Sequence, residues 1–190
     1  MIMRETIKAP TDNPNKVLAR DNLSAMSVFA SLVVGADGST SRDGSSSGIA
    51  SGADRTTFLA RRRKADFILI GGQTARTEPY HRTPVPVVVA SHSMINALAD
   101  NRLAHWWNLS PVSALEKGIK KFGPNVLVEA GPRLINELIQ ARVLDGIFLS
   151  ITSVTGGEDA IQVDELLSKF SVIERDEIQG TLFIEAKTLK

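Results

Sequence analysis

The sequence predicts an α/β fold built on a mixed, mostly parallel sheet with helices on both faces. Two observations predict the parallel part: short apolar runs alternate with helical patterns, and glycine-containing junctions follow two of these runs. A third concerns the C-terminal end, where two candidate strands, 170–175 and 181–188, meet around Gly180. Alternation of strands and helices favours parallel pairing, whereas a short connection favours an antiparallel hairpin.

Length and composition indicate one folded domain that follows an N-terminal arm. The chain has 190 residues, of which 43% are hydrophobic and 23% charged, as is typical of a globular domain with a core. Residues 1–24 are polar and contain Pro10 and Pro14, so we expect an arm there. The single domain is expected over 25–190.

Charge and cysteine content exclude several classes of partner and site. Lys and Arg exceed Asp and Glu by 22 − 21 = 1, so no basic excess indicates a nucleic acid or an anionic membrane. The chain has no cysteine, which excludes disulfides, thiolate nucleophiles and Cys-built zinc sites. Its histidines lack metal-ligand spacing, residues 1–5 lack the apolar region typical of a secretory signal, and no apolar run is long enough to span a membrane. We expect a cytoplasmic protein without a metal, a membrane or a nucleic-acid partner.

The first core strand is expected over 26–34 and leads into residues 35–48, which we name the Ser/Gly loop. Gly, Ser, Thr and Asp occupy all but two of its positions. Composition alone fits a flexible linker equally well. The position of the segment, between a core strand and a capped helix, favours a binding loop.

The next helix is expected to begin at Ser51, because Ser51 and Asp54 have the spacing of a capping box. It ends in the basic run 61–64. Basic residues in a last turn complement the helix dipole, but the same run could form an anion site, and both interpretations stay open.

The remaining elements follow from hydrophobic periodicity and from the glycines and prolines at their ends. Strands are expected over 66–70, 84–90, 125–128 and 147–153. Helices are expected over 93–103, over 111–122, after Gly131 and Pro132, and over 160–169.

Two strand-to-helix junctions, 70–74 and 129–132, place small residues at the carboxyl ends of buried strands. Open α/β sheets bind ligands at such ends, and a helix N-terminus offers free N–H groups to a phosphate. Thr74 could add a hydroxyl, while Arg76 and Arg133 lie just beyond the junctions as charge partners. Neither junction has the glycine spacing of a Rossmann fingerprint or a P-loop.

Four segments together carry a recognisable motif pattern: ADGSTSRDGSSSGIASGADR (36–55), FLARRRKADFILIGGQTARTE (58–78), VLVEAGPRLINELI (126–139) and LDGIFLSIT (144–152). They resemble the pyrimidine reductase family of riboflavin biosynthesis, which has the dihydrofolate-reductase-like fold. The family pattern consists of SLDG, a Ser- and Gly-rich loop, LRA-x-ADAILVGAGTVR, VLVEGGP-x-L and LVDEL. The resemblance implies a single reductase-like domain, a homodimer, and reduction of a phosphoribosylamino-pyrimidine by NADPH. We expect this reductase without the deaminase that accompanies it in bifunctional members.

The resemblance also implies roles for individual residues. Asp37 and Glu129 are the carboxylates expected to face the reacting carbon; the structural alternatives are an Asx-turn at Asp37 and a helix cap at Glu129. The residues expected to bind the cofactor are Thr74, Glu78, Gly131, Pro132, Arg133, Leu134, Ile135 and Asn136. Those expected to bind the substrate are Ser46, Arg62, Arg82 and Glu129.

The sequence departs from the family pattern at two places. The SLDG motif is replaced by residues 35–38, GADG, and Ser31 stands where many bacterial members carry a lysine. Two alternatives therefore stay open: a reductase of another small heterocycle, such as a dihydrofolate-like compound, or a non-catalytic nucleotide-binding homologue. The basic set Arg62, Arg76 and Arg82 favours a phosphorylated substrate.

Overall fold

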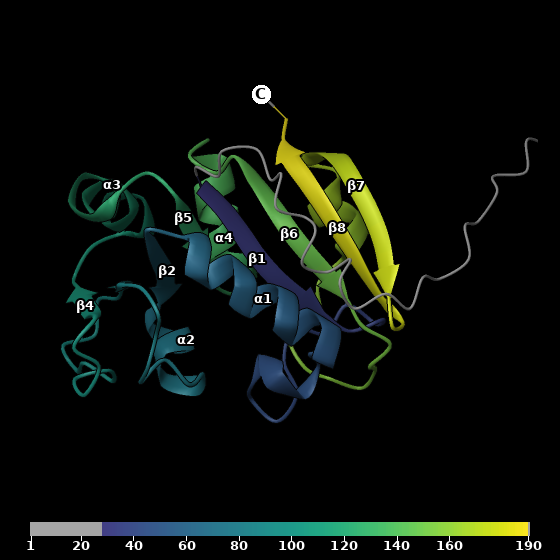
Figure 1. Cartoon of the computed structure of the whole chain (residues 1–190), viewed down its shortest axis with the longest axis horizontal. Helices are drawn as coiled ribbons and strands as arrows, with labels where there is room; N and C mark the ends of the chain where they lie inside the picture. The colour runs from purple at the N-terminus through teal and green to yellow at the C-terminus, as the bar shows by residue number, and fades with distance from the viewer. Residues whose placement is uncertain (1–27, 190) are drawn as a thin grey trace, which may run out of the picture.

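The computed structural model describes residues 28–189, so the arm expected over 1–24 lies outside the described residues. Eight strands form one sheet in the order β4-β3-β2-β5-β1-β6-β8-β7 (Figure 1). The strands are β1 Val28–Val34, β2 Phe67–Gly71, β3 Val87–Ala90, β4 Ala104–Trp107, β5 Val126–Val128, β6 Gly146–Ile151, β7 Phe170–Ile178 and β8 Thr181–Thr188. The helices are α1 Gly52–Lys64, α2 Gly72–Thr77, α3 Pro111–Phe122, α4 Pro132–Gln140 and α5 Val163–Leu167, with a 3₁₀ turn over Ser46–Gly48.

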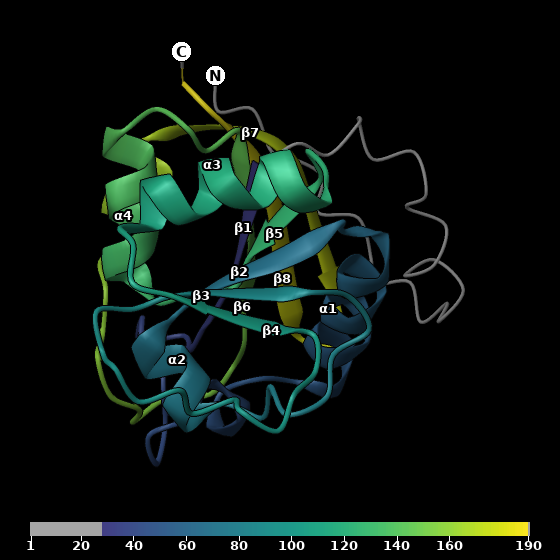
Figure 2. The ribbon, with the colours of Figure 1, turned by 90° about the vertical axis from the view of Figure 1, so that its left-hand side faces the viewer.

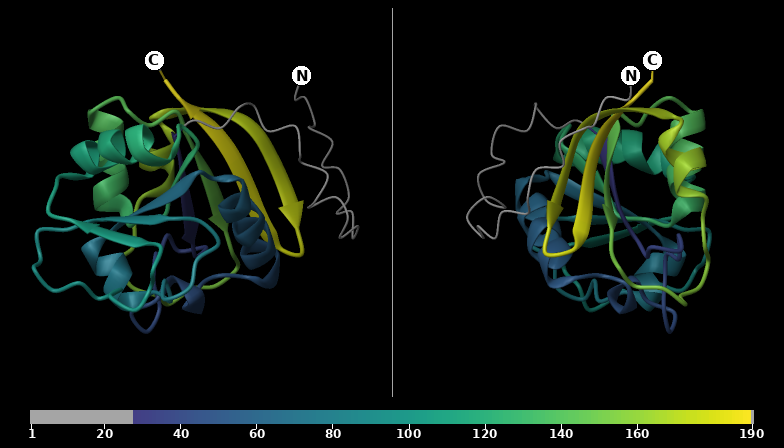
Figure 3. Two further views of the ribbon diagram at one scale, coloured as in Figure 1. Left: turned by 60° about the vertical axis from the view of Figure 1, so that its left-hand side comes forward. Right: turned by 90° about the vertical axis from the view of Figure 1, so that its right-hand side faces the viewer.

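Strand pairing follows the predicted mixed pattern. The strands β1 to β6 pair in parallel, and β5 lies between β1 and β2. The last strands reverse direction, because β8 pairs antiparallel with β6 and β7 pairs antiparallel with β8. Figure 3 shows this hairpin at one edge of the sheet. The predicted mostly parallel sheet with a C-terminal antiparallel hairpin is confirmed.

Helices cover both faces of the sheet. Figure 2 shows α1 on one face and α3 with α4 on the other. Alternate residues of β2 face different sides, since Phe67 and Leu69 join one apolar cluster while Ile68 and Ile70 join another. The start of α1 is confirmed: the Ser51 side chain accepts a hydrogen bond from the Asp54 N–H at 3.0 Å.

The helix predicted over 93–103 is wrong, because this stretch consists of turns that lead into β4. Its polar side chains bond to nearby backbone N–H groups and so compete with helix formation. Ser93 Oγ accepts from Ile95, Asn96 Oδ1 from Leu98, and Asn101 Oδ1 from Leu103. The four-residue strand β4 was not predicted at all.

Candidate functional site

The Ser/Gly loop is fixed to a second loop, residues 152–161, by backbone hydrogen bonds. Thr40 N donates to Glu158 O at 3.0 Å, and Glu158 N donates to Ser41 O at 2.7 Å. Further along, Ile161 N donates to Gly38 O at 2.9 Å. A flexible linker would lack these bonds, so the geometry agrees with the binding-loop interpretation of this segment.

The carboxylate of Asp37 ties these two loops together. Its Oδ1 accepts hydrogen bonds from the N–H and the hydroxyl of Ser39, and its Oδ2 accepts one from Gly156 N at 2.6 Å. These bonds, that from the Ser39 hydroxyl first, lower the pKa of this exposed carboxyl to about 2. Because Oδ1 accepts from the backbone N–H two residues further on, the geometry favours the Asx-turn alternative, and a catalytic role for Asp37 stays a prediction.

Glu78 connects the Ser/Gly loop to α2. Its carboxylate accepts a hydrogen bond from Ser46 N at 2.7 Å and another from the Ser45 hydroxyl at 3.1 Å. The Glu78 N–H in turn donates to Thr74 O at 3.0 Å, at the end of α2. Hydrogen bonds therefore link Thr74, Glu78 and Ser46, the residues that we expected at the cofactor and the substrate.

The basic run at the end of α1 turns two of its side chains inward. The guanidinium of Arg61 lies 4.0 Å from the centre of the Phe148 ring, beneath α1. Arg62 instead points to the end of β5, where its Nε and Nη2 donate to Glu129 at 2.8 and 2.6 Å. Arg63 and Lys64 are exposed. The run is therefore not simply a solvated set of charges at the helix dipole.

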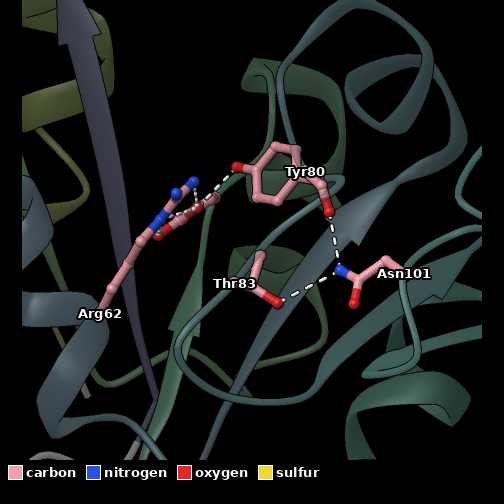
Figure 4. A network of polar contacts seen from close by, with 5 residues as sticks. Arg62, Tyr80, Thr83 and Asn101 are labelled. Carbon is pink, nitrogen blue, oxygen red and sulfur yellow. Dashed lines mark hydrogen bonds and ion pairs between the residues drawn. The ribbon is translucent and has the colours of Figure 1, made fainter.

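Glu129 directly follows β5 and is the centre of a buried polar network (Figure 4). Besides the bidentate contact from Arg62, its Oε2 accepts a hydrogen bond from the Tyr80 hydroxyl at 2.5 Å. Glu129 is 4% exposed and Tyr80 is 3% exposed. Three segments distant in sequence thus meet at one carboxylate.

Burial and charge act against each other in this network. Burial raises the pKa of Glu129, while the hydrogen bond and the charge of Arg62 and the hydrogen bond from Tyr80 limit the rise. Burial, helped by the nearby Glu129 charge, raises the pKa of Tyr80 well above its ordinary value. The tyrosine therefore stays protonated and donates its hydrogen, and the always-cationic Arg62 favours the ionised form of Glu129.

Asn101 holds the backbone of the tyrosine. Its Nδ2 donates to Tyr80 O at 2.7 Å and to Thr83 Oγ1 at 3.3 Å, as Figure 4 shows. The sequence reasoning missed both Tyr80 and Asn101. One signal was present, since Tyr80 is the only tyrosine of the chain and lies two residues after Glu78.

The two glycine junctions lie next to each other because β2 and β5 are neighbours in the sheet. A Cβ added to Gly71 would lie 3.4 Å from Leu134 Cδ1, and one added to Gly131 would meet no described atom within 4 Å. Within residues 28–189, no side chain caps the start of α2 or of α4. Open space therefore lies beside the uncapped N–H groups of α4, which suits a phosphate, whereas the start of α2 is more closely packed.

The other residues predicted to bind the cofactor or the substrate differ in their burial and in their contacts. On α4, Ile135 is fully buried in the core, so only its backbone is available to a ligand. Asn136 Oδ1 accepts a hydrogen bond from Lys169 Nζ at 3.0 Å, and Arg133 is exposed. Pro132 is the first residue of α4, which suits proline because that position needs no donor. Arg82 is exposed and lies apart from the bonds of the Glu129 network.

Within residues 28–189, no group of three His, Cys, Asp or Glu side chains is arranged to hold a metal ion. In the same residues, no helix has both the length and the apolar surface needed to cross a membrane.

Several solved structures share this fold at low sequence identity. A deaminase/5-amino-6-(5-phosphoribosylamino)uracil reductase from Thermotoga maritima superposes with a TM-score of 0.67 and 16% identity, covering 86% of this chain and 57% of that one. A pyrimidine reductase-like protein from Corynebacterium diphtheriae gives 0.65 and 14%, covering 94% and 96%. RibD from Acinetobacter baumannii gives 0.66 and 12%, covering 93% and 62%. The chain thus spans little more than half of the Thermotoga protein.

Sequence comparison identifies the family. No curated protein matches the chain significantly. A family model described as the RibD C-terminal domain matches residues 26–174, which is 149 of the 190 positions. The chain therefore belongs to the RibD C-terminal domain family, which confirms the resemblance of its motifs to the pyrimidine reductases of riboflavin biosynthesis.

Proposed function

We propose that the protein is a cytoplasmic oxidoreductase that uses NADPH to reduce a phosphoribosylamino-pyrimidine in riboflavin biosynthesis. Membership of the RibD C-terminal domain family supports a reductase. The observation that carries the proposal is the position of Glu129, which is held by Arg62 and lies two residues before the open junction at Gly131. A buried charged pair thereby stands beside a site suited to a dinucleotide.

The cofactor would be held mainly by backbone groups. The N–H groups at the start of α4, with those at the start of α2, are the donors available to its phosphates. Thr74 and Arg133 would add a hydroxyl and a positive charge at the two junctions. NADPH supplies the hydride when it is bound, so the protein needs to provide position and charge rather than a strong nucleophile.

The substrate would be held on the other side of Glu129. Its carboxylate stabilises positive charge that develops at the ribose C1′ carbon, and Arg62 keeps this carboxylate ionised. Arg82 is exposed and Ser46 half-buried, which leaves both available to the ribose phosphate. The cofactor and the substrate would thus meet beside a carboxylate that is fixed before either binds.

Cofactor preference is the first test of the proposal. The protein is titrated with NADPH and with NADH while the fluorescence of Trp106 and Trp107 and the unfolding temperature are followed. We expect NADPH to stabilise the fold, by about 2.7 kcal/mol at a concentration 100 times its Kd. Absence of binding by either nucleotide would favour a non-catalytic homologue.

Substrate choice is tested by NADPH oxidation with 5-amino-6-(5-phosphoribosylamino)uracil, with dihydrofolate as the comparison. We expect turnover of the phosphorylated pyrimidine and not of dihydrofolate. Turnover of dihydrofolate alone would contradict the proposed substrate class while leaving a reductase.

The role of Thr74 is tested by Thr74→Val, with Thr56→Val as the matched control. Thr56 is exposed on α1 and its hydroxyl bonds only within that helix among the described contacts, at 3.0 Å to Gly52 O. We expect weaker NADPH binding in the first variant and unchanged binding in the second. Equal affinity of both variants would remove Thr74 from the cofactor site.

A homodimer formed through the sheet edge is also part of the proposal. β7 is the outermost strand at one edge, and Val172 and Ile173 on it are 38% and 51% exposed. An edge strand offers backbone groups to a second copy. Analytical ultracentrifugation should then give the mass of two chains, and a single-chain mass would contradict this part.

A further inference from the structure

We propose that Tyr80 is a positioning residue that fixes the Glu129 carboxylate against Arg62 and thereby orients the group that meets the substrate. The inference rests on the proposed function, because it deepens the role given there to Glu129. Nothing in the motif resemblance assigned a role to Tyr80, which was recognised only from the geometry of the network in Figure 4.

Tyr80 contacts both members of the ion pair. Its hydroxyl donates to Glu129 Oε2 at 2.5 Å, and the guanidinium of Arg62 lies 4.7 Å from the centre of its ring. The same guanidinium also lies 4.2 Å from the ring centre of Phe58. Arg62 therefore contacts two aromatic rings while it makes its bidentate contact, and these contacts restrict its orientation.

Contacts outside the ion pair also hold Tyr80 in place. Its ring packs in an apolar cluster with Ile70, Ala75 and Leu98, and its carbonyl accepts the hydrogen bond from Asn101. The residue is 3% exposed. A side chain fixed by the core in this way can hold a carboxylate in one orientation before a ligand arrives, which is what positioning requires.

The charged and titratable groups that face Glu129 in the described structure are Arg62 from α1 and Tyr80 from the segment after α2. Both lower the pKa of Glu129 against the effect of burial. Removal of the tyrosine hydroxyl should therefore raise that pKa. The ionised form would then be lost at a higher pH than in the unchanged protein.

A spectroscopic experiment tests the contact without any substrate. Because Tyr80 is the only tyrosine of the chain, labelling with [¹³Cζ]tyrosine gives a single NMR signal. We expect this signal to shift as acid protonates Glu129, to lose that shift in Glu129→Gln, and to retain it in Glu116→Gln, a control on the exposed side of α3. A signal that does not sense Glu129 in the unchanged protein would overturn the proposal.

A kinetic experiment tests the consequence. Tyr80→Phe keeps the ring over Arg62 and removes only the hydroxyl. We expect the KM for the pyrimidine to rise roughly tenfold, as for loss of a hydrogen bond to a charged group, with unchanged NADPH affinity. The acid limb of kcat/KM should move to higher pH. An unchanged KM and pH profile would overturn the positioning role.

The two experiments separate this proposal from the proposed function. If the unchanged protein reduces neither test substrate, the proposed function fails, and the NMR titration still decides whether Tyr80 holds Glu129. A circular dichroism spectrum and an unfolding temperature close to those of the unchanged protein would show that Tyr80→Phe retains the fold. Should that variant fail to fold, the titration of the unchanged protein and of Glu129→Gln decides alone.

Discussion

Asp37 and Glu129 are both carboxylates held by several hydrogen bonds, but their pKa values shift in opposite directions because Asp37 is exposed to solvent and Glu129 is buried. Asp37 is exposed, so its three donors lower its pKa with little opposition from burial. Glu129 is buried, and the loss of water raises its pKa despite Arg62 and Tyr80. Asp37 thus stays ionised and stabilises the loops over a wide pH range. The charge of Glu129 lies in the protein interior, where electrostatic interactions are stronger than in water.

The lowered pKa of Asp37 predicts how stability depends on acid. The folded-state pKa, about 2, lies below the ordinary value of 3.8, so the stabilisation is fully present above pH 3.8 and is lost as pH falls through 2. Urea unfolding at a series of pH values should show that Asp37→Asn loses this part of the pH dependence. Identical pH dependence in both proteins would contradict the interpretation.

Removal of Arg62 should destabilise the fold strongly, because it leaves the buried Glu129 carboxylate without its cation. We expect Arg62→Met to lower the free energy of unfolding by about 3–5 kcal/mol near neutral pH. Arg63→Met, a neighbouring exposed arginine, should change it by less than about 0.5 kcal/mol. Urea unfolding measures both variants, and similar losses in the two would refute the special role of the pair.

The sequence alone could not predict the different environments of Asp37 and Glu129. The donors that distinguish them come from distant positions: Gly156 lies 119 residues from Asp37, and Arg62 lies 67 residues from Glu129. Motif resemblance identified Glu129 and Arg62, but it named no third member of the network. Tyr80 lies 49 residues from Glu129, and the contact between them depends on how three segments fold together.

At the scale of elements, packing against the sheet explains why α3 contains a glycine, a residue with low helix propensity. Gly118 lies within α3, where alanine would ordinarily be more stable. The ring of Phe67 on β2 occupies the space, since a Cβ at Gly118 would lie 2.5 Å from Phe67 Cζ. The glycine therefore lets this helix approach the sheet closely.

We expect Gly118→Ala to lower the free energy of unfolding by about 1–3 kcal/mol, because the added methyl group overpacks the contact with Phe67. Gly52→Ala provides the control at the start of α1, where no described atom lies within 4 Å of the added Cβ. That variant should be unchanged or more stable by up to about 1 kcal/mol. Calorimetry distinguishes the two, and stabilisation by both substitutions would contradict the packing argument.

Capping residues in the sequence correctly predicted where capped helices begin. The helix expected over 111–122 matches α3, where Ser110 accepts a hydrogen bond from Ser113 N and Pro111 opens the helix. The same reasoning failed over 93–103, where Ser and Asn side chains bond to the backbone and form turns instead. Helical periodicity in apolar residues was present there without a cap to support it.

At the scale of the whole molecule, the two loops joined by Asp37 should behave as one unit. Their backbone bonds cross from the Ser/Gly loop to 152–161 at Thr40, Glu158 and Ile161. We expect these three amides to exchange with solvent at similar rates, and Asp37→Asn to speed all three. Hydrogen exchange measured by NMR checks this, with the amide of Ile184 in β8 as an unaffected reference. Acceleration of one amide alone would contradict a shared opening.

The placement of β5 has a consequence for how the protein is made. Among the described strands, β1 and β2 are joined only through this three-residue strand, whose synthesis ends at Val128. Until then, a growing chain holds two apolar strands with unsatisfied edges and no partner to close the gap between them. We therefore expect a nascent chain stalled before Val126 to aggregate more readily than one that contains β5, although it already contains Arg62 and Tyr80.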